Sequence, residues 1–169
     1  VVAHISMANP FCEILSQILS QEIKKLLTKE KRMHIGGTYL AMEGPAFSTK
    51  AESKLYRDWG CSIIGMTNHT EARLAKEAEI AYSSLSMVTD YDCWNQHCKN
   101  VSVEMVIKNL MENAKFARSI ISFAAKRISS LRPASSFHDA LKEALVTPKE
   151  HVPEKTKNKI KLFTEKYWI

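Results

Sequence analysis

Short apolar segments alternate with amphipathic helical segments along most of this 169-residue chain. The apolar segments are bounded by Gly, Pro or Asn, which is typical of strands. Between them, apolar residues recur three or four positions apart, as on one face of a helix. Because parallel strands need a helical crossover, this alternation predicts an α/β domain with a mostly parallel sheet.

The predicted strands cover residues 1–6, 38–42, 61–66 and 80–88. The predicted helices cover residues 11–27, 49–60, 68–79, 102–131 and 137–145, followed by a basic helix that ends at 167–169; Arg132-Pro133 closes the long helix. Thr49 with Glu52, and Asn68 with Glu71, have the capping-box spacing that starts a helix. Gly60 can serve as the left-handed stop of the helix that Thr49 opens. We expect one domain portion, with the sheet in residues 1–130 and a helical extension in 131–169.

Two predicted helices carry apolar faces that we expect to be buried. Leu55 and Trp59 mark the inner side of the helix over 49–60. The stripe on the long helix consists of Val103, Val106, Ile107, Leu110, Met111, Ala114, Ala117, Ile120, Ile121, Ala124 and Ile128. No apolar run approaches the roughly 20 residues that a membrane-spanning helix needs, so we expect no membrane protein. The chain opens on a predicted strand without Met or a signal-peptide pattern, so we expect it to start within a fold.

The charge is unevenly distributed along the chain. The total is 24 basic and 18 acidic side chains, and residues 95–169 alone hold 14 basic and 7 acidic ones. Lysines over 149–166 could mark a nucleic-acid interface, but Glu150, Glu154 and Glu165 are interleaved with them. Mixed charge of this kind favours a solvated helical face, and we expect no nucleic-acid partner.

The cysteines indicate neither a disulfide framework nor a metal site. Cys12, Cys61, Cys93 and Cys98 form no CxxC pair, which is typical of reduced thiols in a cytoplasmic protein. Cys93, His97 and Cys98 are crowded into six residues without a fourth ligand elsewhere, which is poor geometry for a tetrahedral metal. We therefore expect no metal.

Three polar segments each follow a predicted strand: residues 43–48, 65–68 and 89–94. Ligands of parallel α/β sheets bind beyond the carboxyl ends of the strands, so we expect these segments to meet. Asp90 and Asp92 would project to one side of an extended chain. Such a pair can bind a metal, cap a helix near Trp94, or grip a ligand.

If the Asp90–Asp92 pair binds a purine, one ionised carboxylate would accept a hydrogen bond from the exocyclic amino group of the base. The other, kept protonated by a desolvated and like-charged site, would donate to a ring nitrogen. Phe47 offers a flat surface to a base, and its alternative role is ordinary core. Thr67, just before a helix, can help to hold an anion, and its alternative role is simple capping.

Taken in order, the motifs resemble a known family. They are residues 43–48 (EGPAFS), 51–53 (AES), 59–60 (WG), 65–67 (GMT), 74–77 (LAKE) and 89–94 (TDYDCW). This set resembles the methylthioadenosine phosphorylases of the trimeric purine nucleoside phosphorylase family. The TDYDCW block is the specific part, since phosphorylases of 6-oxopurines generally have Asn at the position of Asp90. The resemblance is strong over residues 1–128 and looser beyond.

The resemblance implies the C-terminal portion of a phosphorylase-type, three-layer α/β domain, followed by C-terminal helices. It implies a pentosyltransferase of purine and methionine salvage in the cytoplasm, which converts methylthioadenosine and phosphate into adenine and 5-methylthioribose 1-phosphate. Phosphate is a co-substrate and no cofactor is implied; the family is trimeric. Alternatives are an adenosine or methylthioinosine phosphorylase, or a non-catalytic purine-binding remnant.

On the base side, the resemblance implies that Asp90 accepts a hydrogen bond from the amino group of adenine. Asp92 would be the catalytic general acid at the five-membered-ring nitrogen, a role that contributes about 10²–10⁴-fold in rate. Tyr91 would supply backbone to the purine wall, and Phe47 would pack against the base.

On the sugar side, the resemblance implies that Ser48 and Val103 influence which substrate is accepted. Met66 would pack against the ribose and Thr67 would contact phosphate. Val103 and Val106 would form the methylthio slot, a role compatible with helix core.

Three features depart from the family pattern. Ala46 stands where Arg is usual, and His69-Thr70 stand where Val-Pro is usual, next to Thr67. The family's glycine-rich phosphate loop and Arg-His phosphate pair belong to an N-terminal half that these residues do not contain. We therefore expect a separate chain to carry the phosphate-binding half, since half a sheet leaves an unpaired edge. A truncated or degraded chain is the alternative.

Overall fold

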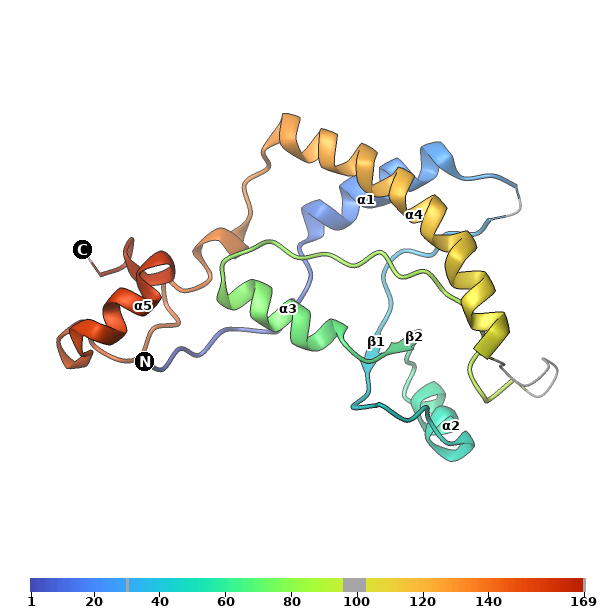
Figure 1. The fold of residues 1–169 in the computed structure, drawn as a ribbon, viewed down its shortest axis with the longest axis horizontal. Coiled ribbons are helices and arrows are strands. Elements are labelled where there is room, and N and C mark those ends of the chain that lie inside the picture. Colours follow the sequence, from blue (N-terminus) through green and yellow to red (C-terminus); the bar gives the residue numbers. More distant parts are fainter. Residues whose placement is uncertain (30, 96–102, 169) are drawn as a thin grey trace. The chain divides into compact units, whose positions relative to one another are not determined.

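The computed structural model of the protein describes residues 1–29, 31–95 and 103–168 (Figure 1). The elements in chain order are α1 (Glu13–Leu26), β1 (Tyr39–Ala41), α2 (Lys50–Asp58), β2 (Ile63–Gly65), α3 (Asn68–Glu77), α4 (Val103–Leu131), the 3₁₀ helices η1 (Ser136–Asp139) and η2 (Lys149–His151), and α5 (Glu154–Thr164). Within these described ranges, none of the helices combines the length and apolar content needed to cross a bilayer.

The chain forms two compact units. The first unit comprises Val1–Ser16, His69–Ser83 and Arg132–Ile169, and the second comprises Gln17–Asn68 and Ser84–Leu131. Every candidate site residue named above lies in the second unit, so the site can be described within that unit alone.

Strands β1 and β2 pair in parallel and form the sheet of the second unit, with α2 between them in the chain (Figure 1). Tyr39 is paired with Ile63 and Ala41 with Gly65. Helix α2 makes the crossover that a parallel pair requires. The α/β class with a parallel sheet is confirmed, although the sheet has two strands in the described part of the chain.

Helix α2 begins and ends as its sequence predicts. The Thr49 side chain accepts from the Glu52 amide at 3.2 Å, and the Glu52 carboxylate accepts from the Thr49 amide at 2.7 Å. Gly60 follows the helix with a φ of 79°, and the Cys61 amide donates to the Tyr56 carbonyl at 3.0 Å. This is the Schellman arrangement that a left-handed glycine allows.

Helices α1 and α4 carry an ion pair with one buried partner. The Glu22 carboxylate accepts from Lys25 Nζ at 2.7 Å and from Arg127 Nη1 at 2.8 Å. Hydrogen bonds from Lys25 and then Arg127 outweigh the effect of desolvation and lower the pKa of Glu22. The buried side chains of the two helices are Ile18, Glu22, Ile120 and Ala124.

The apolar faces of α2 and α4 are largely uncovered, and the expectation that they are buried is wrong for most positions. Leu55 and Trp59 are exposed, and Ser53 is the buried residue of α2. A helical stripe is buried only where another element covers it, and spacing alone does not provide that element. Exposed residues of the α4 stripe are Val103, Ile107, Leu110, Met111 and Ile121.

Two predicted strands are not strands in the structure. Residues 1–6 make one antiparallel bridge, between Ala3 and Leu145, and Val1 and Val2 are about half exposed. Residues 80–88 make isolated contacts, such as the Cys12 amide donating to the Tyr82 carbonyl at 2.7 Å. Apolar, β-branched residues form a strand only when another strand pairs with their backbone.

The helix boundaries differ in three places. The predicted helix over 137–145 is the short η1 followed by turns, and α5 ends at Thr164 rather than at 167–169. Asn68 is the first residue of α3, not the residue before it, and its side-chain amide donates to Ser84 Oγ at 2.9 Å. The second predicted capping box stays a prediction, because this contact uses Nδ2 of Asn68, whereas a cap would use its Oδ1 as the acceptor.

Two lysines of the basic helix form ion pairs with interleaved carboxylates. Lys157 lies 2.6 Å from Glu154, and Lys161 lies 3.2 Å from Glu165. Pairs of this kind are typical of a solvated helical face.

Glu79 joins three segments of the first unit. It follows α3 with a φ of 56°, and its carboxylate accepts from the Leu141 amide at 2.9 Å, from Lys166 Nζ at 2.8 Å and from the Tyr167 hydroxyl. Burial alone would raise the pKa of Glu79. The hydrogen bonds from Lys166, Tyr167 and Leu141 outweigh that effect and hold the pKa below its ordinary value of 4.5.

Because the pKa of Glu79 is lowered by folding, its contribution to stability is present above pH 4.5 and is lost as the pH falls through the folded value. We predict that Glu79→Gln lowers the free energy of unfolding at pH 7 by about 2 kcal/mol, the typical value of hydrogen bonds to a charged group. Urea unfolding at pH 7 and about pH 3.5 checks this. The native chain should lose more stability between the two pH values than the Gln variant; equal losses would exclude Glu79 as a source of the pH dependence.

Candidate active site

The carboxyl ends of β1 and β2 meet at one edge, as parallel pairing requires. The Met42 amide donates to the Gly65 carbonyl at 2.8 Å and so continues the pairing one residue beyond β1. The segments that leave this edge are residues 43–48, which lead into α2, and 66–67, which lead into α3. Two of the three predicted segments are therefore adjacent.

Gly44 packs against Met66 and brings the first segment onto the second. Gly44 has a φ of 69°, and a Cβ atom built on it would lie 2.7 Å from Met66 Sδ. The Met66 side chain thus lies against the turn that precedes Phe47. Thr67 is exposed at the start of α3, and its proposed contact with phosphate stays a prediction.

The third segment, residues 89–94, is joined by side-chain hydrogen bonds to helix α2 and to the first segment. Ser53 Oγ donates to Asp92 Oδ2 at 2.5 Å, and Cys93 Sγ donates to the Ser48 carbonyl at 3.4 Å. All three segments therefore lie together in the second unit. His97 and Cys98, considered above with Cys93 as metal ligands, lie outside the described residues.

Asp90 closes a local turn rather than projecting beside Asp92 from an extended chain. Asp90 Oδ1 accepts from the Asp92 amide at 2.9 Å, and Oδ2 accepts from Thr89 Oγ1 at 2.6 Å. Asp92 has a φ of 57°, in the left-handed region. The expectation of an extended Asp-x-Asp is therefore wrong. Each carboxylate oxygen has a second lone pair, so the turn leaves Asp90 able to accept from a ligand.

Aromatic residues of the site face solvent. Phe47 is 78% exposed, so it is not part of the core that the described residues form. Tyr91 is 63% exposed, and its ring lies edge-on to Trp94 with centroids 6.0 Å apart. The Arg57 guanidinium lies 3.8 Å from the centroid of Trp94 on its ring face. The exposed Tyr91 ring thus lies directly after Asp90 in the chain, against Trp94.

Helix α4 is attached to the same segment at its N-terminal end. Asn109 Nδ2 donates to the Thr89 carbonyl at 2.6 Å, and Asn113 Nδ2 donates to the Val88 carbonyl at 3.2 Å. Val103, one helical turn from Val106, is 66% exposed, and Val106 is partly buried. The predicted methylthio slot therefore lies on the helix that is bonded to the Asp90 segment.

Sequence reasoning assigned no role to Ser53, Arg57 or Asn109, although Ser53 stands in the motif over 51–53. Ser53 and Arg57 are four residues apart on α2, and this spacing places them on one helix face. No signal in the sequence indicated that Ser53, rather than Leu55 and Trp59, would be the buried residue of α2.

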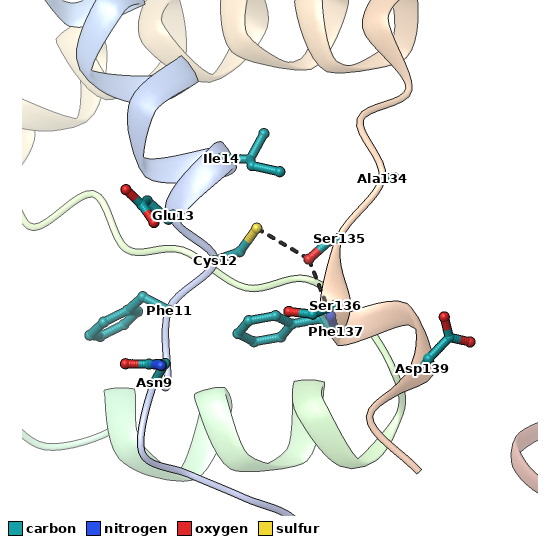
Figure 2. Close-up of a pocket in the computed structure, with 10 residues that line it drawn as sticks. All are labelled: Asn9, Phe11, Cys12, Glu13, Ile14, Ala134, Ser135, Ser136, Phe137 and Asp139. Atoms are coloured by element: carbon teal, nitrogen blue, oxygen red, sulfur yellow. Dashed lines mark hydrogen bonds between the residues drawn. The ribbon is translucent and has the colours of Figure 1, made fainter. Parts of the chain in front are cut away.

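A separate cavity of about 620 Å³ lies in the first unit (Figure 2). Figure 2 shows Cys12 Sγ and Ser135 Oγ, 3.4 Å apart, at its wall. None of the predicted site residues lines it. The lining residues are Asn9, Phe11, Cys12, Glu13, Ile14, Ala134, Ser135, Ser136, Phe137 and Asp139.

The Gly44–Met66 contact gives a prediction with an internal control. Gly44→Ala and Gly60→Ala both place a Cβ at positive φ, at 69° and 79°, but only the first meets another atom, since nothing lies within 4 Å at Gly60. Left-handed backbone alone costs about 1–2 kcal/mol for Ala. Urea unfolding should show that Gly44→Ala loses more stability than Gly60→Ala, because Met66 must move. Equal losses would mean that Met66 yields freely.

The sequence matches the phosphorylase superfamily over residues 2–125. It is 63% identical over 167 residues to S-methyl-5′-thioadenosine phosphorylase of Prochlorococcus marinus, covering 99% of this chain and 53% of that protein. The enzyme of the same description from Thermosynechococcus vestitus is 50% identical over 167 residues, covering 99% of this chain and 58% of that protein. The chain thus spans about half the length of these curated relatives.

Solved structures agree with the sequence matches. A methylthioadenosine phosphorylase sourced from an antarctic soil metagenomic library superposes with a TM-score of 0.88 at 44% identity, covering 96% of this chain and 56% of that one. Methylthioadenosine phosphorylase from Schistosoma mansoni in complex with adenine gives 0.66 at 35% identity, covering 76% of this chain and 49% of that one. With the family match extending from residue 2 to residue 125, beyond the Asp90 segment and into α4, this chain belongs to the phosphorylase superfamily.

Proposed function

We propose that this chain forms the purine and methylthio side of a cytoplasmic S-methyl-5′-thioadenosine phosphorylase that needs no cofactor. The reaction converts S-methyl-5′-thioadenosine and phosphate into adenine and 5-methylthioribose 1-phosphate. The observation that carries the proposal is the Ser53–Asp92 bond of 2.5 Å, which joins the Asp90 segment to the helix that follows the Phe47 turn. The names of the similar proteins support the substrate.

In this reaction the C1′–N9 bond breaks while a phosphate oxygen bonds to C1′, and the purine leaves with the bonding electrons. Asp92 donates a proton or a hydrogen bond to the five-membered ring of the purine, which lowers the energy of the leaving base. Asp90 accepts from the 6-amino group and so selects adenine. Phe47 packs against the base and Met66 against the ribose; Tyr91 contributes backbone to the purine wall.

The remaining roles follow the same assignment. Val103 and Val106 form the methylthio slot, with Ser48 and Val103 tuning substrate choice. Thr67 contacts phosphate, and its place at the start of α3 supports this, because helix N-termini favour anions. Cys12, Cys61 and Cys93 are free thiols, which is in keeping with the cytoplasm.

We infer that a polypeptide outside these 169 residues supplies the rest of the phosphate site and completes a trimeric assembly. Two observations support it. The chain spans 53% of the relative from Prochlorococcus marinus. In addition, α4 leaves a row of large apolar side chains exposed, among them Val103, Leu110 and Met111, and such rows mark surfaces that another chain covers.

The test combines an assay with native mass spectrometry. The chain is co-expressed with the part of the Prochlorococcus marinus relative that it does not match. We predict adenine release from methylthioadenosine only when phosphate and both polypeptides are present, in assemblies built on threes.

Two results would contradict the proposal. A folded two-chain complex that binds adenine, without any effect of phosphate and without turnover, would indicate a non-catalytic purine-binding protein. A chain that is folded, soluble and monomeric alone would exclude the split assembly.

Asp90→Asn tests the selection of adenine. An amide can donate where the carboxylate only accepts, so we predict that the variant shifts preference from methylthioadenosine towards methylthioinosine. The ratio of kcat/KM for the two nucleosides, measured in the complex, reports this. Adenosine is the control, because it shares the base with methylthioadenosine and differs at the 5′ position. An unchanged ratio would remove Asp90 from base recognition.

A further inference from the structure

One face of helix α2 holds the segment that carries Asp92. Ser53 and Arg57 lie four residues apart on this helix, and each contacts that segment. Ser53 Oγ donates to Asp92 Oδ2 at 2.5 Å, and the Arg57 guanidinium lies 3.8 Å from the Trp94 ring centroid. Helix α2 thus contacts the segment on both sides of Cys93, at Asp92 and at Trp94.

The Ser53 hydroxyl is committed to this contact. Ser53 is 2% exposed, and a buried hydroxyl must be hydrogen-bonded to avoid a desolvation penalty. Its acceptor is Oδ2 of the Asp92 carboxyl group, and a hydrogen bond to such a group is stronger when the group is ionised. Burial therefore holds the Ser53 side chain in place, and its hydrogen bond restrains the Asp92 side chain in turn.

Asp92 needs such a restraint because its backbone is left-handed, with a φ of 57°. Non-glycine residues keep this conformation where their surroundings impose it, and they are found at functional sites more than elsewhere. The Asp92 amide is held by Asp90 Oδ1 at 2.9 Å, and its side chain is held by Ser53. Backbone and carboxylate are thus both oriented from within the second unit.

The two carboxylate oxygens of Asp92 have different surroundings. Oδ2 accepts from Ser53, whereas Oδ1 has no hydrogen-bond partner among the residues that the structure describes. The orientation of Oδ2 therefore fixes the direction in which Oδ1 is presented. A proton carried by Oδ1 can be transferred without disturbing the bond from Ser53.

We propose that Ser53 is a positioning residue for Asp92: its hydroxyl fixes Oδ2 so that Oδ1 faces the departing purine. This rests on the function proposed above. As the proton leaves Oδ1, the carboxyl becomes a carboxylate, and the bond from Ser53 becomes charge-assisted and about twice as strong. An interaction that strengthens only in the transition state raises kcat and leaves KM nearly unchanged.

Three variants in the two-chain complex test the role of Ser53. Ser53→Ala removes the donor, and we predict that kcat falls about tenfold or more, as expected for a hydrogen bond to a charged group, with KM within about threefold. Ser53→Thr keeps the hydroxyl and should recover kcat to within about threefold of the native value. Thr49→Ala weakens the same helix at its N-cap without touching Asp92, and kcat should stay within about twofold.

The kinetic outcomes that overturn the proposal are specific. An unchanged kcat in Ser53→Ala excludes positioning. A loss in Thr49→Ala as large as that in Ser53→Ala assigns the effect to helix stability. A loss in Ser53→Ala that appears in KM alone assigns it to uniform binding.

Hydrogen exchange of the amides of residues 90–94, in the same complex, separates this proposal from the proposed function. Ser53→Ala should speed exchange at Asp92, whose amide bonds to Asp90, while Thr49→Ala leaves it unchanged. If the native complex turns over no nucleoside, the proposed function fails, and faster exchange in Ser53→Ala still supports the restraint on Asp92. If the native complex is active and exchange and kcat are both unchanged in Ser53→Ala, the positioning role alone fails.

Discussion

The parallel pairing of β1 with β2 is the constraint on which the candidate site depends. Each strand is three residues long, yet the pairing sends both chain exits from the same edge. One exit becomes the Gly44 turn and Phe47, and the other becomes Met66 and Thr67. Helix α2 must bridge the two strands, and its inner face then meets the Asp92 segment. With an antiparallel pair, the two exits would lie at opposite edges of the sheet.

The caps of helix α2 were predictable from the sequence, whereas strand pairing and the burial of helix faces were not. The Thr49–Glu52 box and the Gly60 stop depend on residues within one helical turn, so their spacing is sufficient. Residues 1–6 and 80–88 have the composition of strands, but a strand also needs a neighbour with free backbone groups. The apolar row on α4 failed as a core prediction for the same reason, since burial depends on a second surface.

The candidate site shows the same division. The rule for parallel sheets predicted that the segments of Phe47 and Met66 leave one edge, and they do. The Asp90 segment follows no strand in the described part of the chain and is joined to the others by side-chain hydrogen bonds. The predicted geometry was wrong at Asp92, because an extended chain was assumed where the backbone is left-handed. Ser53 was noted only as part of the motif over 51–53 and was given no role, because a small polar residue in a helix gives no periodic signal of what it contacts. Tertiary contact, rather than pattern, makes that hydroxyl part of the site.

Because Glu79 contacts Lys166 and Tyr167, a mutation near the 3′ end of the coding sequence can remove partners of a partly buried charge. The codons for these two residues specify partners of a carboxylate that is 11% exposed, so changes in them affect the stability of the first unit. A stop codon in front of Lys166 would leave that charge with the Leu141 amide alone among its described partners. Nonsense and frameshift changes this far along the chain are therefore expected to destabilise the first unit, although they remove only its last residues.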